Sequence, residues 1–150
     1  KYGVNMAITT SVICNSFKKE LFEGTHNFKQ TGGNSFKLSL YTNSAVLGKS
    51  TTSFTTDAQV SNSGQYTSGG GALVNGGTSL STNTAIVDFA DRSFTGVTLT
   101  ARGALIYNDT ASGDPAVCVL DFGGDKTATS GTFTIQFPAF TAGAAILRVT

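Results

Sequence analysis

The sequence predicts a mainly β fold: a two-layer antiparallel β-sandwich of the jelly-roll or Greek-key type, with one N-terminal helix. Three observations support this prediction. Thr and Gly are the most frequent residues and only 13% of all residues are charged, which favours strands and turns over solvated helices. About seven or eight short runs alternate apolar and polar residues, as strands with one buried face do. Clusters of Gly, Asn, Asp and Ser separate these runs and suit turns.

The chain of 150 residues suits one domain, residues 1–150, with a hydrophobic core of its own. We expect residues 1–10 to form an extended N-terminal arm. The residues before Met6 lead into no apolar stretch with a cleavage site, so we expect no signal peptide, and Met6 suits a natural start.

Residues 11–23 are predicted to form the helix. Apolar residues recur at helical spacing and make one stripe, formed by Val12, Ile13, Phe17, Leu21 and Phe22. The hydroxyl side chains of residues 9–11 suit the N-cap, and Gly24 suits the position that ends the helix. We expect the stripe to pack on the sheet or on a neighbouring subunit.

Three alternating runs outside the central region predict single strands at residues 36–41, 84–89 and 144–149. Their buried faces are predicted to carry Phe36, Leu38, Leu40, Ala85, Val87, Phe89, Ala145, Leu147 and Val149. The last strand would tie the C-terminus into a sheet. Residues 42–81 are predicted to be ordered, irregular β structure with long loops, because an apolar residue recurs every several positions and long structureless stretches are rare in compact domains.

The central region, residues 94–137, is predicted to form an antiparallel meander of three strands at residues 97–107, 116–122 and 132–137. Turn-forming residues fill the two connections, at 108–115 and 123–126. The middle run is apolar on both faces except at Asp121, which is typical of a strand that is covered on both sides.

The two cysteines, Cys14 and Cys118, each lie in an apolar run and are too few for a disulfide framework. We expect two buried free thiols, a usage that fits synthesis in a reducing cytoplasm. A disulfide between them is the alternative.

The formal net charge is +1 and the basic residues are scattered, which argues against a nucleic-acid partner or an anionic membrane surface. No apolar run is long enough to predict a membrane span. His26, the only histidine, is expected to be a capping or surface residue, and the acids of residues 108–115 to lie in a surface turn. Asn108 begins a glycosylation pattern, which carries little meaning without a secretion signal. We therefore predict no catalytic, metal-binding or cofactor-binding residues, and no enzymatic activity.

Seven segments form an ordered set along the chain: MAITT (6–10), SFKKELFEG (16–24), FKLSLY (36–41), DFAD (88–91), ARGALIY (101–107), VLDFG (119–123) and GTFTIQFP (131–138). The set resembles a family of small virion structural proteins encoded by tailed bacteriophages, many from aquatic hosts. The resemblance covers nearly the whole chain from Met6, and the five residues before Met6 depart from the family pattern. It implies a structural role without enzymatic activity.

The resemblance implies a place in the virion after synthesis in the host cytoplasm. A capsid decoration or cement protein best matches a small β domain, with the major capsid protein or another virion protein as partner. Such a protein is expected to be a homo-oligomer, with a trimer favoured. A tail, neck or fibre subunit is the second reading. A carbohydrate-binding β-sandwich is the third, and the lack of Trp with only four Tyr argues against it.

Overall fold

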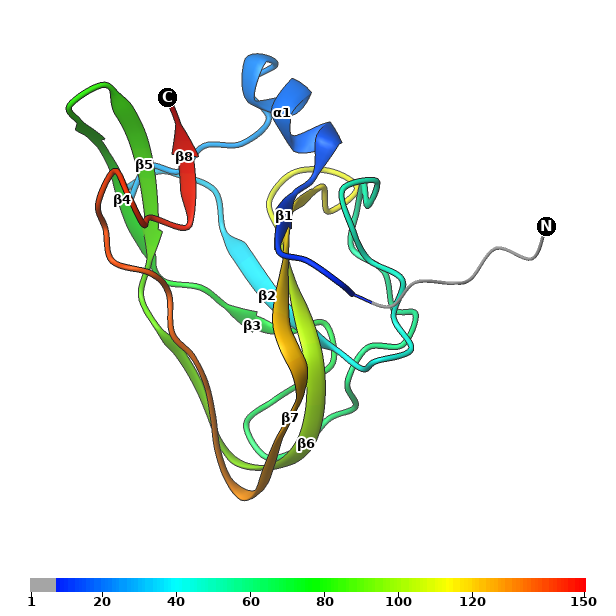
Figure 1. Ribbon diagram of the computed structural model, residues 1–150. Coiled ribbons are helices and arrows are strands. Elements are labelled where there is room, and N and C mark those ends of the chain that lie inside the picture. Colours follow the sequence, from blue (N-terminus) through cyan, green and yellow to red (C-terminus); the bar gives the residue numbers. More distant parts are fainter. Residues whose placement is uncertain (1–7) are drawn as a thin grey trace.

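The computed structural model describes residues 8–150, which fold into two antiparallel β-sheets and one short helix (Figure 1). The mainly β, two-sheet fold with one helix near the N-terminus is therefore confirmed. Residues 1–7, which include Met6 and most of the predicted arm, lie outside the described residues. Ile8, the first described residue, is buried, and its carbonyl accepts a hydrogen bond from the Arg102 side chain at 3.1 Å.

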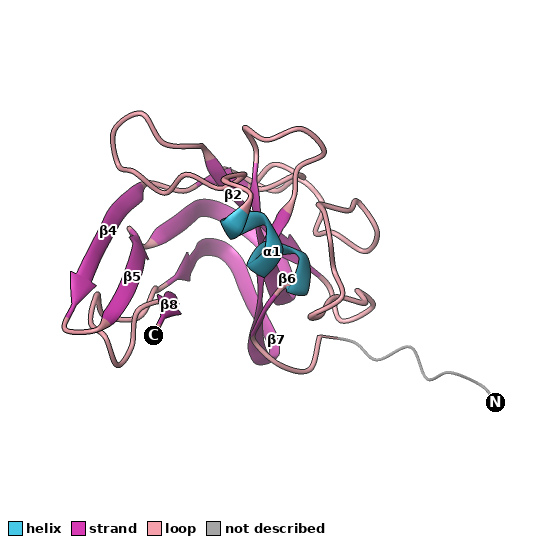
Figure 2. Ribbon diagram, turned by 90° about the horizontal axis from the view of Figure 1, so that it is seen from above, coloured by secondary structure: helices cyan, strands magenta, loops and turns pink. Residues whose placement is uncertain are grey.

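The larger sheet has five strands in the order β1-β7-β6-β2-β3. Its strands are β1 (Val12–Ile13), β2 (Phe36–Tyr41), β3 (Gly71–Ala72), β6 (Arg92–Asn108) and β7 (Ala116–Ile135). The smaller sheet has the order β4-β5-β8, with β4 (Asn75–Ser81), β5 (Thr84–Phe89) and β8 (Leu147–Val149). Seen from above, the smaller sheet lies to one side of the long strands β6 and β7 (Figure 2). The predicted strand at the C-terminus is confirmed, although it is shorter than expected.

The predicted three-strand meander is wrong, because its second and third strands belong to one long strand, β7, which pairs with β6 along a single hairpin. The predicted turn at residues 123–126 is a bulge. Gly103 pairs with Asp121 whereas Ala101 pairs with Lys126, so residues 122–125 loop out and β7 then continues beside the same neighbour. Gly123 has φ +75°, which lets the chain enter the bulge without strain. Bulges bend strands, and the hairpin curves strongly (Figure 1).

The predicted start of the helix at residue 11 is also wrong. The helix is α1 (Asn15–Phe22), and its N-cap is Cys14, without a side-chain capping bond. Residues 12 and 13 are instead β1, which pairs with β7, because two β-branched side chains favour an extended backbone beside an available strand. The Ser11 hydroxyl, one of the expected caps, accepts a hydrogen bond from the Asp121 amide at 2.9 Å. The predicted end is confirmed, since Gly24 follows the helix with φ +72°.

An aromatic cluster joins the two sheets. Phe36 of β2 stacks on Phe28 with ring centroids 4.4 Å apart and contacts Phe89 of β5 at 5.8 Å. Phe89 also contacts Phe137 at 5.8 Å. Because these rings come from both sheets, the hydrophobic core is continuous between them.

Residues 42–74 are ordered and largely irregular, as predicted, and residues 42–70 pack on β2. The prediction of irregular structure is wrong for residues 75–81, which form the regular strand β4 and pair with β5. The Tyr66 hydroxyl accepts a hydrogen bond from the Leu40 amide at 2.8 Å, and the Tyr41 hydroxyl donates to the Thr55 carbonyl at 2.7 Å. Phe36, Leu38 and Leu40 are buried as predicted. Ser39 and Tyr41, expected on the open face, are buried too, because this segment covers them.

Candidate functional site

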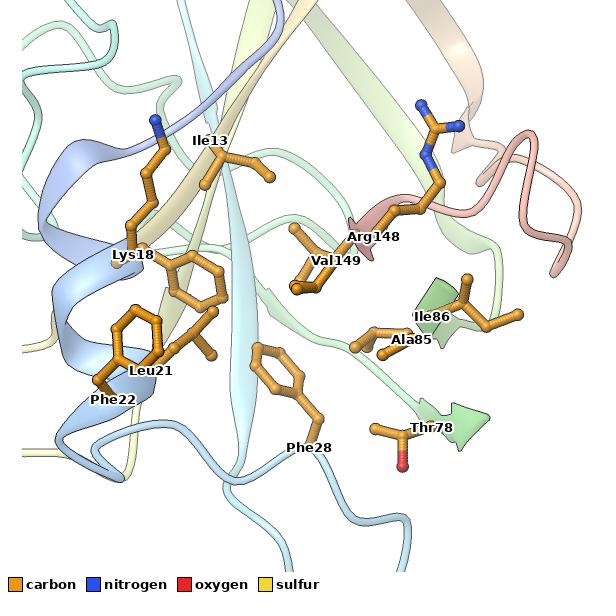
Figure 3. Close-up of a pocket in the computed structure, with 13 residues that line it drawn as sticks. Ile13, Lys18, Leu21, Phe22, Phe28, Thr78, Ala85, Ile86, Arg148 and Val149 are labelled. Carbon is orange, nitrogen blue, oxygen red and sulfur yellow. The ribbon is translucent and has the colours of Figure 1, made fainter. Parts of the chain in front are cut away.

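An apolar groove lies between α1 and the smaller sheet (Figure 3). Its volume of about 410 Å³ falls within the range of roughly 300–1,000 Å³ that is typical of ligand sites. Side chains of α1 form one wall, β5 and β8 form the other, and Ile13 of β1 lies at one end between them. Sequence reasoning did not predict this groove, whose lining is almost entirely apolar.

The groove exposes apolar side chains that an isolated chain normally covers. The Phe22 side chain on the α1 wall is 96% exposed, and Val149 on the β8 wall is 60% exposed. Ala85, which pairs with Val149 across β5 and β8, is also exposed. The sequence pattern predicted both Ala85 and Val149 on buried faces. Both side chains point into the groove, and no other part of residues 8–150 covers them (Figure 3).

The exposure of Phe22 follows from helix geometry. Phe17 and Leu21 are four residues apart and share the face of α1 that packs inward, where Phe17 is buried and Leu21 half-buried. Phe22 lies one position further, about 100° around the helix axis. The prediction that Phe22 belongs to the buried stripe is therefore wrong.

A second depression, of about 360 Å³, adjoins the first and shares Ile13 and Arg148 with it. It lies between β1 and the chain segment that leads into β8. Within residues 8–150, β1 pairs only with β7 and β8 pairs only with β5, so each strand is the edge of its sheet. The second depression therefore lies beside both edges, because its lining includes Val12 and Ile13 of β1 and Arg148 of β8.

Two cations lie at the end of the groove nearest Ile13. Lys18 extends from the α1 wall and Arg148 from the β8 side (Figure 3). The Arg148 guanidinium donates to the carbonyls of Ala142 and Gly143 at 3.2 and 2.8 Å. Among the described residues, neither cation forms an ion pair, and no carboxylate lines either depression.

His26 lies in a buried polar cluster, so its predicted place as a capping or surface residue is wrong. Its Nε2 lies 2.7 Å from the Glu20 carboxylate and its Nδ1 lies 3.1 Å from the Asn108 amide nitrogen. Because the Asn108 NH₂ group donates, Nδ1 accepts and the ring proton belongs on Nε2, which donates to Glu20. Both ring nitrogens therefore have hydrogen-bond partners within the folded chain.

Asn108, at the end of β6, is the centre of this cluster. Its NH₂ nitrogen also lies 3.0 Å from Asn34 Oδ1 and 3.3 Å from the Thr25 carbonyl oxygen, so its two hydrogens are shared among three acceptors. Its Oδ1 accepts from the amides of Thr110 and Ala111. The side chain thus ties the segment after α1 to the β6–β7 connection. Because it is completely buried, the glycosylation pattern it begins is inaccessible in the folded chain.

We expect Asn108→Ala to lower the free energy of unfolding by about 2–4 kcal/mol, because it leaves several buried polar groups without their partner. Urea denaturation followed by circular dichroism measures this change. Asn43→Ala is the control, since Asn43 is exposed and bonds only to Asp125 among the described residues; its loss should stay below about 0.5 kcal/mol. Equal losses in both variants would contradict a structural role for the cluster.

The connection at residues 108–115 is a turn between β6 and β7, as predicted. Asp109 pairs with Lys37 at 3.0 Å, and Asp114 has φ +48°, a backbone conformation that Asp tolerates in turns. The described residues contain no group of three or more His, Cys, Asp or Glu side chains arranged to hold a metal ion.

Both cysteines are buried free thiols, as predicted. Burial raises the pKa of Cys14 from 9.0 to about 11, and the nearby Glu20 carboxylate adds to the effect. Burial also raises the pKa of Cys118, well above the usual range of a thiol.

We therefore expect both thiols to react slowly in the folded protein. At pH 8, a pKa of about 11 in place of 9.0 lowers the thiolate fraction of Cys14 about a hundredfold, and burial slows access further. In denaturant without a reductant, a chromogenic disulfide reagent should label two thiols per chain. Labelling that appears only after a reductant is added would establish a disulfide instead.

Three of the four tyrosines, Tyr41, Tyr66 and Tyr107, are described by the structure, and all three are buried. None of these rings is available to stack on a sugar. Residues 8–150 also include no helix with the length and apolar character needed to cross a membrane. No protein-family model, curated protein or solved structure matches this chain.

Proposed function

We propose that the protein is a virion structural protein of a tailed bacteriophage, located on the outside of the capsid as a decoration or cement protein. The observation that carries the proposal is the open apolar groove, where Phe22, Ala85 and Val149 stay exposed. Apolar surface that one chain leaves uncovered, bordered by polar groups, is typical of protein interaction sites. The sequence resemblance points in the same direction, toward a partner that is the major capsid protein or another virion protein.

The fold suits such a role in two ways. The two sheets share one aromatic core, so the body is rigid and loses little conformational entropy when it docks. The chain also carries ordered loops outside the sheets, residues 42–70 above all, which can extend over a neighbouring subunit. We expect copies of the chain to associate on the shell, with a trimer favoured.

Stabilisation of the shell follows from linkage. A protein that binds only the assembled lattice favours that lattice by mass action, by about 2.7 kcal/mol per site when its free concentration is a hundred times its Kd. Because a shell offers many equivalent sites, the contributions accumulate over one particle. The predicted consequence is greater resistance to heat and to the internal pressure of packaged DNA.

The test compares complete particles with particles made without this protein. On heating, we expect the bare shells to release DNA at a lower temperature, and purified protein added back should restore the higher temperature. Equal release temperatures would contradict the cement role. Labelled protein that maps to the tail or neck would instead favour the second reading, a tail, neck or fibre subunit.

A further inference from the structure

The smaller sheet ends at a strand edge that faces the groove. β8 pairs with β5 through Val149 opposite Ala85 and Leu147 opposite Val87, and among residues 8–150 no strand lies on its other side. The second depression, between β1 and the segment that leads into β8, reaches this edge at Arg148. An exposed edge offers unpaired backbone N–H and C=O groups, which an extended segment from another chain can satisfy.

The side chains next to this edge match what such a segment needs. Alternate side chains of an added strand point to the same face, so those on the groove side would contact the exposed apolar side chains of Phe22 and Val149. This contact would cover the face that carries Ala85 and Val149. The sequence pattern predicts that this face is buried, but the single chain leaves it exposed. An apolar segment therefore fits the groove better than a polar one.

The charges at the groove define the segment further. Lys18 and Arg148 lie on opposite sides of the end nearest Ile13, and no carboxylate of residues 8–150 lines the groove or the adjoining depression. Two cations without an ion-pair partner among the described residues favour an occupant that brings a carboxylate to this end.

We propose that the groove receives an extended, apolar segment of a partner protein, which adds as a strand to the free edge of β8 and brings a carboxylate to the end of the groove where Lys18 and Arg148 lie. The proposal deepens the decoration role and rests on it for the identity of the partner, a subunit of the assembled shell. The backbone hydrogen bonds along β8 would supply affinity, whereas the groove and the two cations would select the sequence.

The first experiment uses the isolated full chain and synthetic peptides. The probe is a peptide of about eight residues that alternates Val with Thr and has Asp at both ends. Alternation puts the Val side chains on one face of the added strand, and an Asp at either end can reach the two cations in both strand directions. One comparison peptide has Lys at both ends, and another carries N-methyl groups on alternate backbone amides. We expect measurable binding by calorimetry for the Asp peptide, and at least tenfold weaker binding for each comparison peptide.

Matched variants locate the binding. Phe22→Ser removes a side chain that is 96% exposed, so the protein should stay folded while its affinity for the Asp peptide falls at least tenfold. Lys18→Glu leaves one cation and one carboxylate at this end of the groove, so it should abolish the preference for the Asp peptide over the Lys peptide. Val74→Ser is the control, because Val74 is 66% exposed and does not line the groove; its affinity should not change.

Several results would overturn the proposal. Equal binding of the N-methylated peptide would show an apolar pocket without strand addition. Binding of dodecanoate in the absence of peptide binding would make the groove a lipid site. Self-association that Phe22→Ser abolishes, again without peptide binding, would make a second copy of this chain the occupant.

A second experiment separates this proposal from the proposed function. Wild-type and Phe22→Ser protein are each added to bare shells, and the bound protein is measured after sedimentation. We expect wild-type protein to bind and Phe22→Ser to bind at least tenfold more weakly. If both bind equally, the groove is not the docking site, although the decoration role stands. If wild-type protein binds the Asp peptide but not the shells, the decoration role fails.

Discussion

Val119→Asp is expected to abolish cooperative folding. Val119 is completely buried in β7, where it pairs with Val12 of β1 on one side and with Leu105 of β6 on the other. The new carboxylate would lie among apolar side chains, and a buried charge without a partner is among the few changes that cost more than about 4–5 kcal/mol. A domain of this size has only about 5–15 kcal/mol of stability in total.

Two further variants make this result interpretable. Val119→Thr keeps the side-chain shape and adds a hydroxyl, so we expect an intermediate loss of about 1–3 kcal/mol. Val74→Asp places the same carboxylate at an exposed position and should change stability by less than about 0.5 kcal/mol. Circular dichroism and urea denaturation report all three. A soluble Val119→Asp protein with a sharp unfolding transition would contradict the central position of this strand.

The strand periodicity of the sequence predicted most of the strands. Side chains alternate between the two faces of a strand, so apolar residues at every second position identify the buried face. Val97, Leu99 and Ala101 are buried while Thr98 and Thr100 are exposed, as the alternation in β6 indicates. The wrong prediction of a meander has a long-range cause. Residues 123–126 have turn chemistry, but whether such residues reverse a chain or bulge out of it depends on the strand beside them. Here β6 extends far enough to pair on both sides of the bulge.

The groove could not be predicted for a related reason. The apolar character of Ala85 and Val149 indicates that other residues cover this face. The sequence does not show whether those residues belong to the same chain or to a partner. Only the placement of α1 and β8 shows that both residues remain exposed. The burial of His26 could not be predicted from its sequence neighbours, because its Nδ1 contacts Asn108, which is distant in the chain.

Phe17→Ala is expected to lower the free energy of unfolding by about 3–5 kcal/mol. The Phe17 side chain is 3% exposed and is held between the His26 ring, 4.8 Å away between centroids, and the Phe28 ring at 5.9 Å. Its removal would leave a cavity beside the buried polar cluster. Because Phe17 also lines the groove, water can enter part of that space, which favours the lower end of the range.

Phe22→Ala provides a matched control for this prediction. It makes the same substitution in the same helix, so the gain in helix propensity, about 0.5 kcal/mol, is shared by both variants, and their difference isolates packing. Because Phe22 is 96% exposed, the isolated protein should lose no stability through this change. A loss below about 1 kcal/mol for Phe17→Ala would show that α1 is not held by its own chain and that its apolar stripe needs a partner subunit. A large loss of stability for Phe17→Ala with none for Phe22→Ala would show that the two faces of α1 have different roles. The face with Phe17 stabilises the fold, whereas the face with Phe22 is available to bind a partner.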